Sequence, residues 1–383
     1  MNKVALIGNL NNNFYVLQRY LIDKGVDCHL YIYSSDPIHF LPENDSWNNK
    51  GFENHKFLNW TVNNFISTKK SVIQKEFIDF KHIFCCGVAP AFLWKAGLPI
   101  NMILPYGSDL YELPFSNARK PAAFLKKLFF NHYMKNGIKE AELFILSEKN
   151  PIYHESLKRL NFSGKINNCG APLVYHPMIK TTKNINSPFT KKINEIKNKF
   201  DFIIFHHVRH VWKSHLDTFY DKGNYKLFQA FRNFIDKYPD SKPVLILFKY
   251  GQDYKHSVKM LNDLNLNDYV IWFEKMPRKE LMLGISSCDL VVGELTKSSF
   301  TYGVVLEALA MEKPVMHSRD DNIYNDLKLY PMIHANKTEE IYKNLDYYYN
   351  NKNELREIGK NGRIWYENHY VKKSIETIME IIS

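Results

Sequence analysis

Short apolar runs alternate with amphipathic segments along the first half of the chain, in a strand–helix–strand order. Runs of this length predict buried strands, and apolar positions spaced three and four residues apart predict helices. The predicted strands are 4–7, 27–33, 82–86, 101–104, 143–146 and 165–168, and the predicted helices are 14–24, 90–96 and 151–160. Residues 34–80 show no clear periodicity and are expected to be irregular. The order predicts a doubly wound parallel sheet of the Rossmann-like type.

The same order begins again after a polar, proline-flanked stretch near the middle of the chain. The stretch 177–190 is therefore predicted to be a linker between two domains. Beyond it, the predicted strands are 201–205, 244–248, 269–273 and 290–292, and the predicted helices are 225–238 and 279–286. A chain of 383 residues is long enough for two such domains.

The apolar helix predicted after residue 303 contains one carboxylate. Its apolar residues form one buried face, and Glu307 lies among them. A buried carboxylate needs a partner, and two hydroxyl groups of a ligand are one candidate. The loop at Gly303 also suits a phosphate, because the first N–H groups of a helix are free and the helix dipole favours an anion there.

Residues 302–315, Y-G-V-V-L-E-A-L-A-M-E-K-P-V, resemble the donor-binding motif of retaining GT-B glycosyltransferases, especially the family-four group. That motif contains two glutamates, of which the second binds the nucleotide ribose and matches Glu307. The first glutamate, which contacts the donor sugar, falls at Ser299 in this chain. The resemblance also implies that Tyr302, Gly303 and Val304 belong to the donor site.

The resemblance implies a GT-B fold, in which two Rossmann-like, doubly wound parallel-sheet domains face each other across a cleft. An N-terminal acceptor-binding domain would span 1–176, and a nucleotide-sugar-binding domain would span 191–360. The helix 361–383 would return to brace the first domain. By the same resemblance, the donor is a nucleotide-diphosphate sugar, the product retains its anomeric configuration, and no cofactor or metal ion is needed.

The second domain offers a cationic loop after its first strand. Arg209, Lys213 and Lys222 follow this strand, at the end where open α/β sheets bind their ligands. Arginine offers bidentate contacts and lysine a point charge to a diphosphate. By resemblance, Arg209 and Lys222 bind the donor diphosphate and act in catalysis, and Lys213 is a rival for the lysine role. The backbone around Lys275 and Met276 is expected, again by resemblance, to hold the nucleobase.

Two loops of the first domain are candidates for the acceptor site. In GT-B enzymes the turn after the first strand faces the cleft, so Gly8, Asn12 and Asn13 are candidates, with a helix N-cap as the alternative for either asparagine. The turn at 105–109 resembles the H-G-x-D turn of the same family, with Tyr106 in place of the histidine. Asp109 is thus a candidate catalytic and acceptor-binding residue, or the cap of the next segment.

The segment 118–136 predicts a basic amphipathic helix. Phe124, Leu125, Leu128, Phe129 and Tyr133 form one stripe, and lysine and arginine supply the other side. Such a helix can lie on an anionic bilayer, and the same pattern also packs against a core and leaves its lysines in water. The net charge of +11 fits an anionic partner, although a lysine-rich surface without a partner gives the same value.

Other features narrow the class of protein. The five cysteines lie mostly in apolar runs, which indicates reduced thiols in a cytosolic protein. His206, His207 and His210 lack the further ligands that a metal site requires. No signal peptide, no apolar run of about 20 residues for a membrane span and no nucleic-acid-binding motif is recognised.

These observations together predict a cytoplasmic glycosyltransferase with no nucleic-acid partner, either free in the cytoplasm or peripheral to the inner face of the membrane. It would transfer a sugar from a nucleotide sugar to a glycan or glycolipid acceptor in surface-polysaccharide assembly. Two alternatives stay open. One is a GT-B-shaped binding or scaffold protein without activity, and the other is a GT-B-like sugar-nucleotide epimerase.

Overall fold

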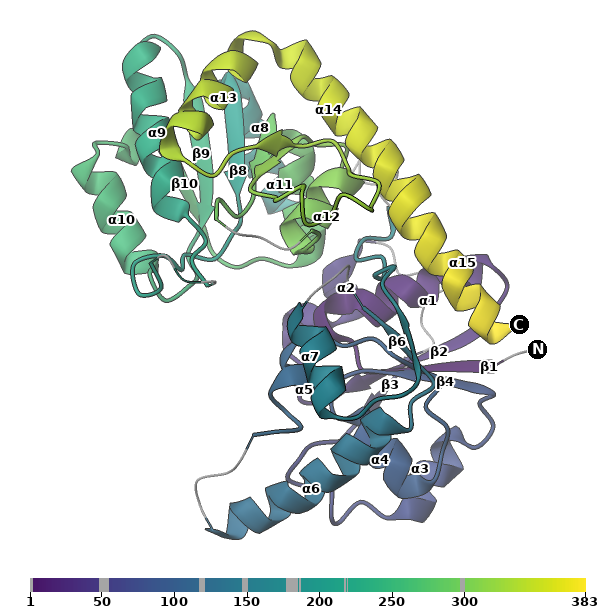
Figure 1. The fold of residues 1–383 in the computed structure, drawn as a ribbon. Coiled ribbons are helices and arrows are strands. Elements are labelled where there is room, and N and C mark those ends of the chain that lie inside the picture. Colours follow the sequence, from purple (N-terminus) through teal and green to yellow (C-terminus); the bar gives the residue numbers. More distant parts are fainter. Residues whose placement is uncertain are drawn as a thin grey trace. The chain divides into compact units, whose positions relative to one another are not determined.

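The computed structural model describes residues 3–47, 55–116, 121–146, 151–176, 185, 187–216, 218, 220–296 and 300–383. Its contacts divide the chain into two compact units, Met1–Tyr175 with Tyr370–Ser383 and His176–His369. Each unit contains one parallel sheet with helices packed against it (Figure 1). Among the described residues, no helix has both the length and the apolar surface that a transmembrane segment requires.

Seven parallel strands form the sheet of the first unit, in the order β3-β2-β1-β4-β5-β6-β7. They are β1 (Lys3–Ile7), β2 (Asp27–Tyr33), β3 (His55–Leu58), β4 (His82–Cys85), β5 (Met102–Ile103), β6 (Leu143–Ile145) and β7 (Lys165–Asn167). The helices are α1 (Asn13–Asp23), α2 (Pro42–Asp45), α3 (Lys70–Phe77), α4 (Ala89–Ala96), α5 (Ser108–Tyr111), α6 (Pro121–Lys139), α7 (Pro151–Arg159) and α15 (Lys372–Ile382). Alternate side chains of β1 face one side of the sheet, so Ala5 and Ile7 join the core cluster that contains residues of α3, α4 and α6.

Six parallel strands form the sheet of the second unit, in the order β10-β9-β8-β11-β12-β13. They are β8 (Phe202–His206), β9 (Pro243–Phe248), β10 (Val270–Phe273), β11 (Leu290–Val292), β12 (Val315–His317) and β13 (Ile333–His334). The helices are α8 (Pro188–Lys199), α9 (Asn224–Lys237), α10 (Tyr254–Asp263), α11 (Arg278–Ser287), α12 (Gly303–Ala310), α13 (Thr338–Asn350) and α14 (Lys352–Trp365). Phe202 and Ile204 of β8 pack in one core with α9 and α13, while Phe205 on the other face lies against Gly284 of α11.

The predicted doubly wound parallel sheets are confirmed in both halves of the chain. The expectation that 34–80 is irregular is wrong, because this segment contains the edge strand β3 and the helix α3. Both elements have weak sequence patterns. An edge strand can leave its side chains in water, and β3 has no buried residue, while α3 buries only Ile73 and Phe77.

The predicted amphipathic helix is present as α6, but most of its predicted stripe does not pack in a core. Phe124, Leu125, Leu128 and Phe129 are exposed, and Tyr133 is half-buried. The core is instead reached from the second half of α6, through residues that include Phe130, Met134 and Ile138. The core-packing interpretation of the stripe is therefore wrong for its first four members.

The last helix, α15, belongs to the first unit. Ser374 Oγ donates a hydrogen bond to the carbonyl oxygen of Cys169 at 3.1 Å, and Ile378 is fully buried. Just before α15, the Tyr370 ring lies against Gly170, whose φ is +66°, and an added Cβ there would lie 2.4 Å from the Tyr370 hydroxyl. The glycine therefore provides the space that the aromatic ring occupies.

Candidate functional site

Glu307 is buried in the middle of α12, and the protein itself supplies partners for its carboxylate. His207 Nε2 lies 2.8 Å from Glu307 Oε2, and an Arg278 guanidinium nitrogen lies 3.7 Å from Oε1. Burial acts to raise the pKa of Glu307, but the His207 hydrogen bond and the Arg278 charge outweigh it and lower the pKa. The group is thus held ionised. A carboxylate has about four acceptor sites, so a ligand hydroxyl can still bind beside these two partners.

His207 reaches Glu307 because of its place at the end of β8. Adjacent residues of an extended chain point to opposite faces, so His206 and His207 face different helices. His206 faces Asn224 of α9, with Asn224 Nδ2 at 2.9 Å from its Nε2. His207 shares its side of the sheet with Phe205, and Tyr250 donates its hydroxyl proton to the His207 carbonyl oxygen at 2.5 Å.

Lys222 is largely buried and paired with Glu294. Lys222 Nζ lies 2.8 Å from Glu294 Oε1, and the backbone N–H of Leu295 donates to the Lys222 carbonyl oxygen at 3.0 Å. The loop depends on Gly223, whose φ is +69° and whose added Cβ would meet Leu295 at 3.0 Å. The two paired residues come from the loops after β8 and β11, which end at the same edge of the sheet.

The start of α12 lies beside this ion pair. The backbone N–H of Glu294 donates to the Tyr302 hydroxyl at 2.7 Å, and Tyr302 is the N-cap residue of α12. Gly303 and Val304, in the first turn, are both partly exposed. The predicted donor residues Lys222, Tyr302 and Gly303 are therefore brought together at the carboxyl edge of the second sheet.

Arg209 lies near Tyr250 and is open to solvent. Burial and the charge of Glu307 raise the pKa of Tyr250, and the exposed guanidinium of Arg209 acts to lower it. Lys275 Nζ lies 5.5 Å from the centroid of the Tyr250 ring, and Met276 is partly exposed next to it. Tyr250 thus lies near Arg209, Lys275 and Glu307.

Lys213 lies in a different environment from Lys222. Its Nζ is 3.5 Å from His256 Nδ1 on α10. The loop around it is tied to Asp253, whose Oδ2 accepts from the backbone N–H groups of Trp212 at 2.7 Å and Ser214 at 3.2 Å. Lys222, rather than Lys213, is the lysine that lies beside Tyr302 and α12.

Ser299 lies outside the described residues. The histidines singled out in the sequence have structural contacts, since His206 Nδ1 is 2.8 Å from the Val292 carbonyl oxygen and His210 Nδ1 is 2.9 Å from Ser257 Oγ. Within the described part of the chain, no group of His, Cys, Asp and Glu could hold a metal ion.

In the first unit, the turn after β1 is held together by its own asparagines. Asn9 Nδ2 donates to the Phe40 carbonyl oxygen at 2.6 Å, and Asn12 Nδ2 donates to that of His39 at 2.9 Å. Asn12 is buried with a φ of +63°, so it precedes α1 without capping it through its side chain. Asn13 is the first residue of α1, and Gly8, with a φ of +94°, lies against Cys86.

Asp109 ties two loops of the first unit together. Its Oδ1 accepts from the backbone N–H groups of Tyr106 at 2.8 Å and Gly107 at 3.0 Å, and its Oδ2 accepts from Gly87 at 3.0 Å. Burial raises the pKa of Asp109, although these hydrogen bonds favour the ionised form. The carboxylate therefore joins the loops after β4 and β5. The expectation that Asp109 could cap the next segment is wrong, because it is the second residue of α5 and the N-cap residue is Gly107.

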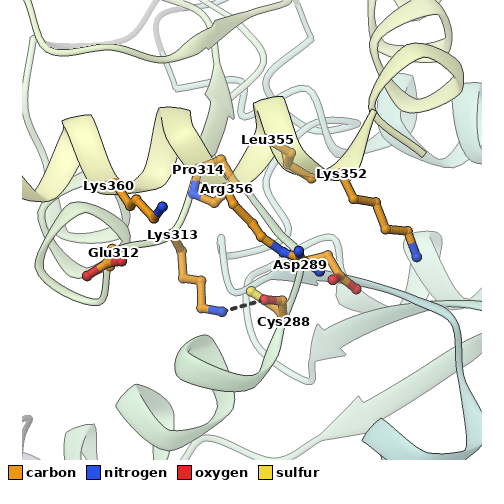
Figure 2. Close-up of a pocket in the computed structure, with 9 residues that line it drawn as sticks. All are labelled: Cys288, Asp289, Glu312, Lys313, Pro314, Lys352, Leu355, Arg356 and Lys360. Atoms are coloured by element: carbon orange, nitrogen blue, oxygen red, sulfur yellow. Dashed lines mark hydrogen bonds between the residues drawn. The ribbon is translucent and has the colours of Figure 1, made fainter. Parts of the chain in front are cut away.

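A pocket of about 220 Å³ lies in the second unit but contains none of the predicted site residues (Figure 2). Asp289 and Pro314 in its wall directly precede β11 and β12, so it lies at the amino edge of the sheet. Lys313 Nζ donates to the Cys288 carbonyl oxygen there at 2.8 Å. The lining residues are Cys288, Asp289, Glu312, Lys313, Pro314, Lys352, Leu355, Arg356 and Lys360. Ligands of open α/β sheets bind at the carboxyl edge, so this pocket is not the candidate site.

Sequence reasoning missed His207, Tyr250, Arg278 and Glu294 as members of the site. The strand alternation at β8 was the one available signal for His207. No sequence signal connects Glu294 to Lys222, which are 72 positions apart, or Glu307 to His207, which are 100 apart. Such pairs depend on which loops the sheet topology places side by side.

Comparison with known proteins places the fold. No family model matches the chain, and no curated protein matches it in sequence. The chain resembles the crystal structure of Anabaena HepE in complex with UDP-glucose, with a TM-score of 0.63 and 15% identity over 99% of this chain and 98% of that one. It also resembles sucrose-phosphate synthase from Thermosynechococcus elongatus, with a TM-score of 0.60 and 15% identity over 99% and 98% of the two chains.

A putative UDP-N-acetylglucosamine 2-epimerase from Listeria monocytogenes is similar as well, with a TM-score of 0.53 and 14% identity over 100% of this chain and 96% of that one. At these identities the likeness concerns the fold alone. Two parallel-sheet α/β units and full-length similarity to such structures identify the architecture, and the chain has the two-domain, Rossmann-like GT-B fold.

Proposed function

We propose that this protein is a glycosyltransferase that takes a sugar from a nucleotide-diphosphate sugar. The observation that supports it most directly is the arrangement at the carboxyl edge of the second sheet. There Lys222, the start of α12 and the ionised Glu307 are neighbours, and Arg209 lies open to solvent beside Tyr250. Full-length similarity to GT-B structures that contain UDP or UDP-glucose supports the same proposal.

The chemistry requires stabilisation of a leaving group. When the glycosidic bond to the diphosphate breaks, negative charge grows on the departing nucleotide, and cations placed there in advance lower the barrier. In our proposal Arg209 and Lys222 bind the diphosphate, helped by the first N–H groups of α12 near Tyr302 and Gly303. The reaction would use no metal ion or cofactor.

The remaining donor contacts follow from the same placement. Glu307 would accept hydrogen bonds from the ribose hydroxyls while His207 and Arg278 keep it ionised and oriented. The backbone at Lys275 and Met276 would hold the base, and Lys213 would lie outside the diphosphate contacts. Val304 and Ser299 stay in the proposal as donor-site residues.

The acceptor side is proposed from the resemblance in the sequence. The candidates are Gly8, Asn12, Asn13, Tyr106 and Asp109. The side chains of Asn12 and Asp109 are hydrogen-bonded to backbone groups, so these two residues would contribute by positioning their loops. We propose a glycan or glycolipid acceptor, retention of configuration and a role in surface-polysaccharide assembly in the cytoplasm. The predicted membrane contact through 118–136 is argued separately below.

Binding of nucleotides is the first test. Isothermal titration of the whole protein with UDP, GDP, ADP, TDP and CDP should give binding to one base, and thermal stability should rise with that ligand. A ligand at about 100 times its Kd adds about 2.7 kcal/mol to the free energy of unfolding. Binding to none of the nucleotides would favour the alternative of an inactive GT-B scaffold.

A sugar-nucleotide epimerase is the second candidate, because the Listeria structure of that class has the same fold. The two activities differ in what they require. An epimerase changes the donor sugar with no acceptor present, whereas a transferase leaves the sugar unchanged or releases it slowly to water. Incubating the bound nucleotide sugar alone and following the sugar by NMR separates them, since appearance of the C2 epimer would replace our proposal.

A further inference from the structure

Four large apolar side chains are exposed on one side of α6. Phe124 is 39% exposed, Leu125 68%, Leu128 52% and Phe129 43%, and we call these four residues the outer α6 face. Their spacing places them on one side of a helix. Phe130, Met134 and Ile138 lie on the opposite side and are buried in the core. The helix therefore has a second apolar side that the core does not use.

The fold explains why only the first half of α6 is uncovered. In the second half, α6 crosses α4 so closely that a Cβ on Gly137 would lie 2.2 Å from the Pro90 carbonyl oxygen. The first turns extend beyond the other helices of the unit (Figure 1). A soluble surface seldom exposes several large apolar side chains side by side without a partner.

A neighbouring turn adds to this apolar surface. The Phe65 ring lies 6.0 Å from that of Phe129, and the next residue, Ile66, is 52% exposed. Lys95 Nζ fixes the turn by donating to the carbonyl oxygens of Phe65 at 2.7 Å and Ile66 at 3.2 Å. The turn is thus fixed beside α6, and its Ile66 side chain is exposed to water.

The charged side chains of α6 itself are all of one sign. Between Pro121 and Lys139 the sequence contains four lysines and no aspartate or glutamate. Lys126, Lys135 and Lys139 are exposed, and Lys127 donates to the Leu113 carbonyl oxygen. Ile66 is followed by another pair, Lys69 and Lys70.

From this combination we propose that the outer α6 face, with Ile66, docks the protein on an anionic lipid bilayer. The apolar side chains would enter the boundary between headgroups and acyl chains, and the lysines would bind lipid phosphates and carboxylates. A second copy of this chain is a poorer occupant, because it would set two lysine-rich surfaces against each other. The lipid surface satisfies both the apolar and the cationic residues.

Flotation of the full-length protein with phosphatidylcholine vesicles, with and without phosphatidylserine, tests the proposal. We expect binding to the anionic vesicles, weaker binding to neutral ones, and loss of binding at high ionic strength. The double variant Leu125→Glu/Leu128→Glu should reduce the partition coefficient by about tenfold or more, since it places two charges in the apolar layer. Both residues are exposed, so the melting temperature should not change.

The matched control changes two exposed isoleucines of the other unit. Ile323 and Ile364 are 54% and 55% exposed, and Ile323→Glu/Ile364→Glu adds the same charge outside the outer α6 face. It should bind vesicles almost as the wild type does. Equal losses in the two double variants would show that net charge alone drives binding and would overturn the proposal, as would no vesicle binding by the wild type.

A change of oligomeric state gives a further decisive outcome. If the wild type is a dimer by light scattering and Leu125→Glu/Leu128→Glu is a monomer, the face is a subunit interface and the lipid proposal fails. The measurement uses neither nucleotide nor acceptor. Its result is therefore separate from that of the proposed glycosyl transfer.

Discussion

Arg209 and Lys213 are four positions apart in one loop, yet their surroundings differ. Arg209 is exposed beside Tyr250, whereas Lys213 contacts His256 on α10. If Arg209 stabilises the leaving diphosphate, Arg209→Ala should lower the transfer rate by two to three orders of magnitude, about 3–4 kcal/mol of transition-state stabilisation. Steady-state kinetics with the donor found by titration would measure it.

Lys213→Ala is the matched control for this variant, because it removes a cation from the same loop and should change the rate only a few-fold. Neither side chain is buried, so both variants should keep the wild-type melting temperature. Turnover like that of the wild type in Arg209→Ala would remove Arg209 from the mechanism.

The ion pair between Lys222 and Glu294 leads to a second prediction. A diphosphate that binds Lys222 must compete with the carboxylate 2.8 Å away. Lys222→Met should weaken nucleotide diphosphate binding by about tenfold or more, which corresponds to about 1.4 kcal/mol. Glu294→Gln should leave binding equal or tighter, because it removes the competing charge and keeps the shape of the side chain.

Calorimetric titration of both variants measures these changes. Weaker binding in Glu294→Gln would mean that Glu294 positions Lys222 for the ligand rather than competing with it. Unchanged affinity in Lys222→Met would place the diphosphate elsewhere.

The predicted site residues and the observed contacts differ in what a sequence can reveal. Arg209 and Lys222 stood out because they follow a strand at the expected edge of a sheet. Glu307 stood out as a carboxylate within an apolar helix, and Tyr302 through the resemblance to the family motif. Their partners did not, since Glu294, His207 and Arg278 are distant in sequence and ordinary in type. The sequence pattern predicts the edge of the sheet at which a residue lies. It does not predict which side chain the residue contacts there.

Gly137 allows α6 to cross α4 at close range. Alanine normally stabilises a helix by about 1 kcal/mol relative to glycine. At Gly137 an added Cβ would lie 2.2 Å from the Pro90 carbonyl oxygen, so Gly137→Ala should instead lower the free energy of unfolding by about 1–3 kcal/mol. Urea unfolding would measure the change.

Lys139→Ala, on an exposed position of the same helix, is the control and should change stability by less than about 0.5 kcal/mol. If Gly137→Ala is as stable as the wild type or more so, the helices separate without cost and the close crossing does not limit the packing.

Strands and helices that bury most of their residues were predictable from the sequence. Elements at the edge of a sheet or on the surface were not. β2 was expected at 27–33 and is found at Asp27–Tyr33, because Cys28 and the run 30–33 make five of its seven residues apolar or aromatic, and these five are buried. β3 was missed because its four residues include His55 and Lys56 and none is buried. The stripe on α6 was recognised, but its periodicity alone does not tell a side that faces the core from one that faces water.

Across the whole molecule, the buried histidines of the second unit predict a response to acid. Burial lowers the pKa of His206 and His317 to about 3 and that of His210 to about 4. These groups stay neutral when folded but bind protons on unfolding below pH 6.5. The second unit should therefore keep its full stability above pH 6.5 and lose up to about 1.4 kcal/mol per pH unit per histidine as the pH falls toward 4.

The first unit should respond differently, because burial raises the pKa of Asp36 to about 6 and also raises that of Asp109. Carboxyl groups with raised pKa values favour the folded state as the pH falls. Hydrogen exchange resolved by peptide, at pH 7 and pH 5 and corrected for intrinsic rates, should show a larger loss of protection in β8 and β12 than in β4 and β5. The reverse order would contradict the assignment of neutral buried histidines.

The membership of α15 in the first unit has a consequence for how the molecule is made. The seven strands of this unit are synthesised early. Ser374, Ile375 and Ile378 leave the ribosome only after every strand of the second unit. Until α15 is synthesised, the side chains of the first unit that pack against it stay exposed to solvent. A chain that stops before Tyr370 should therefore misfold in its first unit. The second unit, although it is next to the deletion, should fold normally.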